Sequence, residues 1–457
     1  MDRRDALKHL LCATASSAMF TSLAGKFSLA QAATVSSPRT LLGTGYKALV
    51  CVFQYGGNDA INMVIPRDTA GYGVYSNSRS ALAIPQNELL QLTPSVPPSG
   101  GGSYGLHPGM GGLQNLFNNG RAAIISNVGP LLYPITKAEY QAGSVPVPAQ
   151  LFSHSDQQVL WQTPTADASD RRGWGGRLAD LFYSSNINQQ LSMNISIDGE
   201  NVFQSGNTIV PYFVGQNGAE GIYFVNDEPW NAPRRNAFLA LRDASHGHAL
   251  QREYASRVRR AMDNETMVTS ALNSAPALGT PFPDTDLGRQ LRMVARLISA
   301  RGALQMDRQI FFVGQGGYDT HDSQLANHPD MLSDLSASLT AFYDAMSAMG
   351  LGDRVTSFTA SDFGRTLTSN GDGTDHGWGS HHFVVGDAVQ GGRIVGTMPD
   401  LTVGGPDDAD WGQIIPRIAV DQYAATLSSW YGMSDTDRAL VFPNLSRFSS
   451  PNLGFMV

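Results

Sequence analysis

The stretch SDFGRTLTSNGDGTDHGWGSHHF, residues 361–383, places carboxylates, imidazoles and a guanidinium among glycines directly after an apolar run. Carboxylates and imidazoles together suit zinc, manganese or iron, whereas calcium prefers oxygen ligands alone. We therefore expect Asp362 and His376 to bind a divalent metal, and Arg365 to hold an oxygen of an anionic substrate. The alternative is a polar loop, since glycine and aspartate are also ordinary turn residues.

Two further groups of such residues follow apolar runs earlier in the chain. The motif GGND supplies Asp59, and the motif GGYDTHD supplies Asp319 and His321. We expect these three side chains to join the same metal site. Each also has a structural alternative, because Asp59 can stabilise a turn, Asp319 can cap the helix that follows, and His321 can be a hydrogen-bonded loop residue.

A hydrolytic site also needs a nucleophile. The segment AQLFSHSDQQVLWQTP offers Ser153 and Ser155 at the start of a predicted helix. A metal and the positive end of the helix dipole would both favour the deprotonated hydroxyl of either serine. The alternative is that these serines are ordinary N-cap residues.

These residues need a scaffold that brings distant parts of the chain together. Four apolar runs, at residues 46–55, 120–130, 310–313 and 355–359, are typical of central strands in a parallel sheet. Between the last two runs, apolar residues recur at helical spacing and Gly350 is placed to end the helix. This order predicts an α/β fold with a mostly parallel central sheet flanked by helices.

The carboxyl edge of such a sheet is where ligands gather. The three groups of candidate residues follow three of the predicted strands, so they converge on one site if those strands are neighbours.

The middle of the chain has a different pattern. Residues 191–225 alternate and are rich in turn residues, which favours a β-rich insertion, and the charged stretch after them is typical of helices. We therefore expect an insertion or cap at about residues 185–285, within a single elaborated α/β domain that spans residues 34–457.

The first 33 residues are typical of an export signal. They combine Arg3 and Arg4 with a mild apolar stretch and end in the small-residue cleavage pattern Ala30-Gln31-Ala32. We expect a twin-arginine-type signal and a periplasmic or secreted protein. An amphipathic helix of the mature protein is the alternative, and the stretch is too interrupted for a stable membrane span.

Composition narrows the possible partners. The 457 residues are 42% hydrophobic and 15% charged, with a formal net charge of −8. Such a composition is typical of a globular protein. The negative charge argues against nucleic acid, because phosphate binding requires a basic surface. It allows a small anionic ester or polymer as substrate, since a bound cation can reverse the local charge. The oligomeric state is not indicated.

The order of these motifs resembles a family of exported bacterial proteins called domain of unknown function 1501. The resemblance rests on ALVCVFQYGGNDAINMVIP, FSHSDQQ, GGYDTH, SDFGRTLTSNGDGTDHGWGSHHFVVG and GGRIVGTMPDL, and it covers about residues 49–401. That family in turn resembles the alkaline phosphatase and sulfatase superfamily. The resemblance implies an α/β sandwich with a divalent metal site at the strand ends.

The resemblance also implies roles for individual residues. It places Asp59, Asp319, His321 and His376 among the metal ligands, and it matches Ser153 to the nucleophile. Asp362 is followed by Phe363, where the superfamily has a metal-ligating histidine. One or two ions, zinc or manganese, are therefore expected. The implied activity is hydrolysis of phosphate or sulfate esters, and the alternative is a non-catalytic exported binding or assembly protein on the same scaffold.

Overall fold

The computed structural model describes residues 45–165, 169–226 and 228–457. The export signal expected in residues 1–33 lies outside these ranges. Within them, no helix combines the length and the apolar character needed to cross a membrane.

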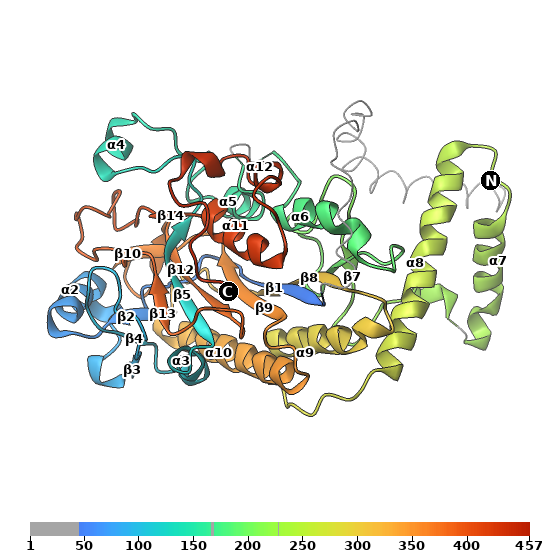
Figure 1. Cartoon of the computed structure of the whole chain (residues 1–457), viewed down its shortest axis with the longest axis horizontal. Coiled ribbons are helices and arrows are strands. Elements are labelled where there is room, and N and C mark those ends of the chain that lie inside the picture. Colours follow the sequence, from blue (N-terminus) through green and yellow to red (C-terminus); the bar gives the residue numbers. More distant parts are fainter. Residues whose placement is uncertain (1–44, 166–168, 227) are drawn as a thin grey trace. The chain divides into compact units, whose positions relative to one another are not determined.

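A nine-stranded sheet, counted over the described residues, forms the centre of the protein (Figure 1). Its strands are β1 Lys47–Gln54, β5 Ala122–Gly129, β6 Asn194–Ser196, β7 Tyr212–Phe213, β8 Arg308–Gln315, β9 Val355–Ser361, β12 Ser380–Val385, β13 Arg393–Val395 and β14 Ile418–Ala419. Their order is β13-β5-β12-β9-β1-β8-β6-β7, and β14 also pairs with β5. Within this sheet, as the structure describes it, the pairings of β12 with β5 and β9 are antiparallel and the others are parallel. The predicted mostly parallel α/β sheet is confirmed.

The four predicted strands are β1, β5, β8 and β9. In β1, which pairs in parallel with both β8 and β9, every residue except Lys47 is buried. A strand with neighbours on both sides and helices over both faces has no contact with water, so its sequence is an unbroken apolar run.

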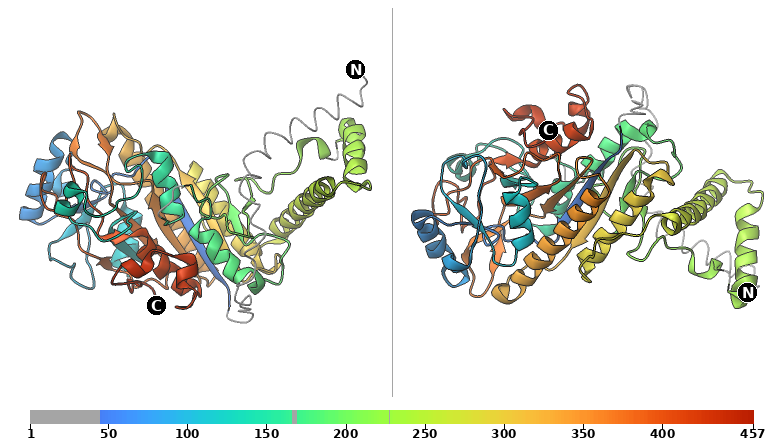
Figure 2. Two further views of the ribbon diagram at one scale, coloured as in Figure 1. Left: turned by 90° about the horizontal axis from the view of Figure 1, so that it is seen from above. Right: turned by 60° about the horizontal axis from the view of Figure 1, so that its bottom comes forward.

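Helices cover both faces of the sheet (Figure 2). Alternate side chains of β1 enter two separate cores: Val50 and Val52 lie in one, and Cys51 and Phe53 lie in the other. The first core is completed by α3 Gly111–Asn118, α9 Asp286–Ser299 and α10 Gln324–Ala348, and the second by α5 His154–Gln162, α6 Trp174–Phe182 and α11 Val420–Tyr431. The remaining helices named here are α2 Thr69–Arg79, α4 Lys137–Ala142, α7 Ala232–Asp243, α8 Ala249–Ser274 and α12 Arg438–Val441.

The helix predicted between the last two strands is α10. Its buried side chains include Leu335, Leu339 and Phe342, which pack against the sheet at helical spacing. Gly350 follows the helix with a φ of 66°, a left-handed conformation that glycine adopts without strain.

Two smaller sheets lie outside the central one. One consists of β2 Val64–Pro66, β3 Leu90–Gln91 and β4 Tyr104–Leu106, and the other is the hairpin of β10 Arg365–Ser369 and β11 Thr374–His376. This hairpin carries two of the candidate site residues, Arg365 and His376.

The segment expected to form an insertion, residues 185–285, contains both strands and helices. The short strands β6 and β7 extend the central sheet at one edge, and helices α7 and α8 follow them. Helix α8 contacts the short helix η6 Ala300–Gly302, which lies before the start of β8. The contact places α8 at the end of the sheet where β8 begins, and the candidate residues Asp319 and His321 follow the other end of β8.

The buried carboxyl of Asp421, in the first turn of α11, makes stability depend on pH. Burial raises its pKa to about 7, against the opposing effects of its own backbone N–H and the charges of Arg177 and Arg447. Its Oδ1 has no hydrogen-bond partner. Because the folded state holds this proton and the unfolded state releases it near pH 4, the free energy of unfolding should fall as the pH rises from about 4 to about 7.

We therefore expect Asp421→Asn to be more stable than the wild type by roughly 2–4 kcal/mol at pH 8 and similar to it at pH 4. Urea unfolding at both pH values measures the difference. Asp330→Asn, which changes an exposed carboxyl on α10, is the matched control and should show no such pH dependence. An equal effect of Asp421→Asn at both pH values would show that folding does not raise the pKa of Asp421.

Candidate metal centre

The three strand ends that carry the candidate residues meet at one edge of the sheet. β1 lies between β8 and β9, and all three strands run parallel. The condition for convergence, that these strands are neighbours, is therefore met. The segments that leave Gln54, Gln315 and Ser361 start side by side, because parallel strands end at the same edge.

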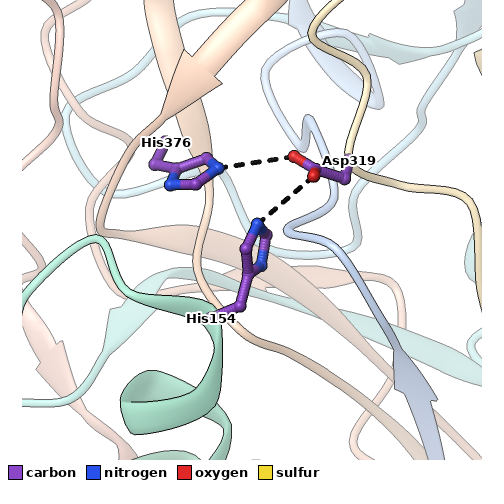
Figure 3. A group of neighbouring side chains, drawn as sticks. All are labelled: His154, Asp319 and His376. Carbon is purple, nitrogen blue, oxygen red and sulfur yellow. Dashed lines mark ion pairs between the residues drawn. The ribbon is translucent and has the colours of Figure 1, made fainter.

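Three side chains at this edge form a compact group: His154, Asp319 and His376 (Figure 3). His154 is the first residue of α5, Asp319 lies in the loop after β8, and His376 ends β11. Their candidate ligand atoms all lie within 4.8 Å of one another. His154 Nε2 is 3.4 Å from Asp319 Oδ2, and His376 Nε2 is 3.4 Å from Asp319 Oδ1.

Hydrogen bonds fix which nitrogen of each imidazole is free to bind a cation. His376 Nδ1 donates to the carbonyl oxygen of Phe152 at 2.7 Å. His154 Nδ1 donates to Asp362 Oδ2, also at 2.7 Å. In the neutral rings both Nε2 atoms then carry a lone pair directed at Asp319, and His154 Nε2 is buried without a hydrogen-bond partner. Metal-binding histidines are held by oxygen atoms in this way.

His321 lies beside this group. Its Nδ1 donates to Asp375 Oδ1 at 3.0 Å. Its Nε2 is 3.1 Å from Asp319 Oδ1 and 2.9 Å from His376 Nε2. Two imidazole lone pairs facing each other at this distance repel, so a proton or another cation belongs between them.

The donor set fits a divalent metal. A tetrahedral ion with bonds of roughly 2.0–2.1 Å holds its ligand atoms roughly 3.3 Å apart, close to the 3.4 Å that separates each imidazole Nε2 from one oxygen of Asp319. Two imidazoles and one carboxylate also match the three protein ligands of catalytic zinc sites, which keep one position open. The hydrogen bond to Asp362 raises the pKa of His154 despite its partial burial, so protons compete with a metal for this nitrogen. Burial lowers the pKa of His376 and favours its neutral, metal-binding form.

Asp362 and Arg365 contact this group from the buried interior of the protein. Asp362 is fully buried, and its Oδ2 accepts hydrogen bonds from His154, from Gln158 and from the backbone N–H of Gly56. It therefore orients His154. Arg365 is also buried, and its Nη1 donates to Asp319 Oδ1 at 2.8 Å.

Further N–H groups of Arg365 donate to the carbonyl oxygen of Gly56 and to Thr374, so its guanidinium is held in place and orients Asp319. Burial raises the pKa of Asp319, but the hydrogen bond and charge of Arg365, with the charges of His154 and His321, bring it below its ordinary value. Asp319 therefore stays ionised, as a metal ligand must be.

The structure does not bring Asp59 into this group. Asp59 is fully buried, and its Oδ2 is paired with the guanidinium of Arg79 and bonded to the amide of Gln324. A carboxylate already neutralised by a buried cation does not need a metal.

Ser153 precedes His154 but has other partners. Its hydroxyl donates to Asp156 Oδ2 at 2.7 Å and lies 3.3 Å from the hydroxyl of Ser155. Sequence reasoning assigned the chemistry of the FSHS motif to its serines, whereas the side chain that contacts Asp319 and Asp362 is His154. The signal was present in the motif, because a histidine in the first turn of a helix that reaches the sheet edge can face the site.

Phe363 fills the position after Asp362. It is fully buried, and its ring centroid lies 4.8 Å from the rings of both His154 and His376. Its ring therefore forms an apolar wall that fixes the two imidazoles from one side.

Gly56 allows the loop after β1 to approach the loop after β8 closely. Its φ is 112°, and a Cβ atom at this position would lie 2.3 Å from the backbone nitrogen of Asp319. We expect Gly56→Ala to displace Asp319 and to weaken metal binding by about 10–100-fold, as loss of a supporting contact does in metal sites. Competition with a chromogenic chelator measures the affinity.

Gly111→Ala in α3 is the control for this substitution. A Cβ at Gly111 meets no atom within 4 Å and its backbone is helical, so metal affinity should not change. Equal affinities for the Gly56→Ala variant and the wild type would contradict the proposed role of Gly56.

The fold and this cluster together define an α/β protein with a candidate metal centre at the carboxyl edge of a mostly parallel sheet. The chain belongs to the family described as Protein of unknown function (DUF1501), whose sequence model matches residues 46–408. The resemblance seen in the motifs is thereby confirmed. A comparison with curated proteins finds none that matches.

Several solved structures are similar to this chain at low sequence identity. The C-terminal periplasmic domain of EcEptC from Escherichia coli, in complex with Zn, is 10% identical with a TM-score of 0.36, over 89% of each chain. The PsFucS1 sulfatase from Pseudoalteromonas sp. is 10% identical with a TM-score of 0.34, over 86% of this chain and 68% of that one. The lipoteichoic acid synthase LtaP from Listeria monocytogenes is 8% identical with a TM-score of 0.36, over 89% of this chain and 78% of that one. Similarity at this level says nothing about the ligand or the activity of this chain.

Proposed function

We propose that this protein is an exported, metal-dependent hydrolase of phosphate or sulfate esters. The observation that carries the proposal is the group of His154, Asp319 and His376, in which each imidazole Nε2 faces the Asp319 carboxylate at 3.4 Å. Three protein ligands with an open position are typical of catalytic rather than structural zinc sites. The choice of phosphate and sulfate esters rests on the sequence resemblance to the alkaline phosphatase and sulfatase superfamily.

The residues around the group have distinct parts in this proposal. A bound zinc or manganese ion would neutralise the ester oxygens and lower the pKa of a coordinated water. Asp362 holds His154, the Phe152 carbonyl holds His376, and Arg365 holds Asp319, so the three ligands are oriented before a substrate arrives. His321, whose side chain is 43% exposed, places its Nε2 at the rim of the group, 2.9 Å from His376 Nε2.

Ser153 stays in the proposal as the nucleophile. Asp156 accepts the hydrogen bond of its hydroxyl at 2.7 Å and is placed to accept its proton. Arg365 was expected to hold a substrate oxygen, but its donors already bond to protein atoms. We therefore propose a positioning role for it.

Metal analysis and ester hydrolysis of the purified protein test the proposal together. We expect about one zinc or manganese ion per chain, because one such ligand group is found among the described residues. We also expect turnover of an aryl phosphate or an aryl sulfate. Removal of the metal with a chelator should abolish turnover, and returning the metal should restore it. A protein without metal above background and without turnover in either assay would refute the proposal.

A second candidate is a non-catalytic exported binding or assembly protein on the same scaffold. Phe363 favours it, because this apolar ring packs against His154 and His376 where the resemblance places a metal-ligating histidine. Stoichiometric metal without turnover across a broad panel of esters would support this second function.

A further inference from the structure

A separate pocket of about 220 Å³ lies at the β7 edge of the central sheet. Its lining comes from the segment after α6, from the strand and loop around β7, and from helix α8. These elements lie next to each other in Figure 1. The pocket shares no residue with the metal centre, and the groups that give it its chemistry are Tyr183, Gln189, Gln190, Tyr212, Arg260 and Asn264.

Several polar groups of this pocket have no partner in the protein. Arg260 is an exposed residue of α8 that forms no ion pair or hydrogen bond with any described residue, and neither does the hydroxyl of Tyr212. Asn264 is only 6% exposed, yet its Oδ1 has no hydrogen-bond partner. The groups of this pocket that a ligand can reach without displacing a protein partner are therefore Arg260 and the Tyr212 hydroxyl.

The chemistry of the lining selects the ligand. Side-chain amides both donate and accept hydrogen bonds, which suits the hydroxyl groups of a sugar. The rings of Tyr183 and Tyr212 offer flat apolar surfaces with polar tips, on which the C–H face of a sugar ring can pack. Arg260 supplies an uncompensated positive charge with a planar fork, the geometry that binds a carboxylate or a sulfate group.

The size of the pocket sets a limit on the ligand. Sites for drug-sized ligands have volumes of roughly 300–1,000 Å³, so a pocket of about 220 Å³ suits a single ring. We infer that this pocket binds one acidic sugar unit, with its hydroxyl groups on the side-chain amides and its anionic group on Arg260. Binding here requires neither a metal nor an active centre, so it can be measured whether or not the proposed hydrolase activity exists.

Glucuronic acid and glucose are the probes that separate the two parts of this inference. Isothermal titration of the full protein should show saturable binding of glucuronic acid, and at least tenfold weaker binding of glucose, which lacks the carboxylate. Arg260→Ala should weaken glucuronic acid binding by about 10–100-fold, as expected when a hydrogen bond to a charged group is lost. Tyr212→Ala should weaken the binding of both sugars.

Arg257→Ala is the matched control. Arg257 lies on the same helix and is exposed, but it pairs with Glu253 and does not line the pocket. Its substitution should leave both affinities unchanged, and so should His154→Ala in the metal centre. The inference is overturned if glucuronic acid shows no saturable binding, if Arg260→Ala binds it as the wild type does, or if glucose binds equally well.

Discussion

Replacing His154 with alanine should remove most of the bound metal from the protein. His154 supplies one of three ligand atoms, and its Nε2 is buried with no other partner. Because zinc sites with four ligands are worth roughly 10–16 kcal/mol, the loss of one ligand should weaken binding on the order of 100-fold or more. Metal analysis after dialysis and a chelator competition measure the effect. Turnover of aryl esters should fall with the metal content.

Substitutions of two residues near His154 test whether the metal is lost because one of its ligand atoms is missing. Asp362→Asn keeps the imidazole of His154 but replaces the acceptor of its Nδ1 proton, so metal binding should weaken by about 10–100-fold. Ser153→Ala removes a hydroxyl that bonds to Asp156, and it should leave the metal in place. If Ser153→Ala keeps the metal but loses turnover, the serine is the nucleophile. Unchanged metal affinity in His154→Ala would contradict the proposed ligand set.

Replacing Arg79 with alanine should cost the protein roughly 3–5 kcal/mol of unfolding free energy, the usual effect of breaking a buried ion pair. Both Arg79 and Asp59 have side chains that are 0% exposed. Arg79 also donates to Asn62 Oδ1 and to the carbonyl oxygen of Thr366. Its removal leaves the Asp59 carboxylate buried with only its amide and backbone contacts. Urea unfolding at pH 7 measures the change.

The exposed pair of Arg257 and Glu253 is the matched control, with side chains that are 69% and 59% exposed. Arg257→Ala should change stability by less than about 1 kcal/mol. The double variant Asp59→Asn with Arg79→Met should recover much of the loss, because it removes both buried charges. If Arg79→Ala destabilises the protein no more than Arg257→Ala does, the buried pair does not carry the stability assigned to it.

The main strands and helices could be predicted from the sequence because the patterns that indicate them lie within short stretches of the chain. The runs that became β1, β5 and β8 are mostly apolar on both faces, a pattern typical of central strands, and β9 is buried as they are although it mixes Thr and Ser with apolar residues. The helical spacing of apolar residues predicted α10 in the same way. The short strands β6 and β7 were harder to predict, because two or three residues carry no measurable periodicity.

The roles of single site residues were less predictable. Asp59 and Asp319 both follow buried strands in glycine-rich motifs, yet one is paired with Arg79 and the other faces His154 and His376. The difference lies in α2, whose last residue is Arg79, twenty positions further along the chain. No local pattern around Asp59 indicates that a buried guanidinium will reach it.

The sequence by itself determined the α/β class, the order of the strands along the chain and the types of residue at the carboxyl edge of the sheet. It did so because burial and periodicity act between neighbouring residues. Only the tertiary structure decided that β1 lies between β8 and β9, and that His154 enters the metal centre while Asp59 does not. Those outcomes depend on contacts between segments that lie far apart in the chain, and a side chain's partners there are set by packing and charge in three dimensions.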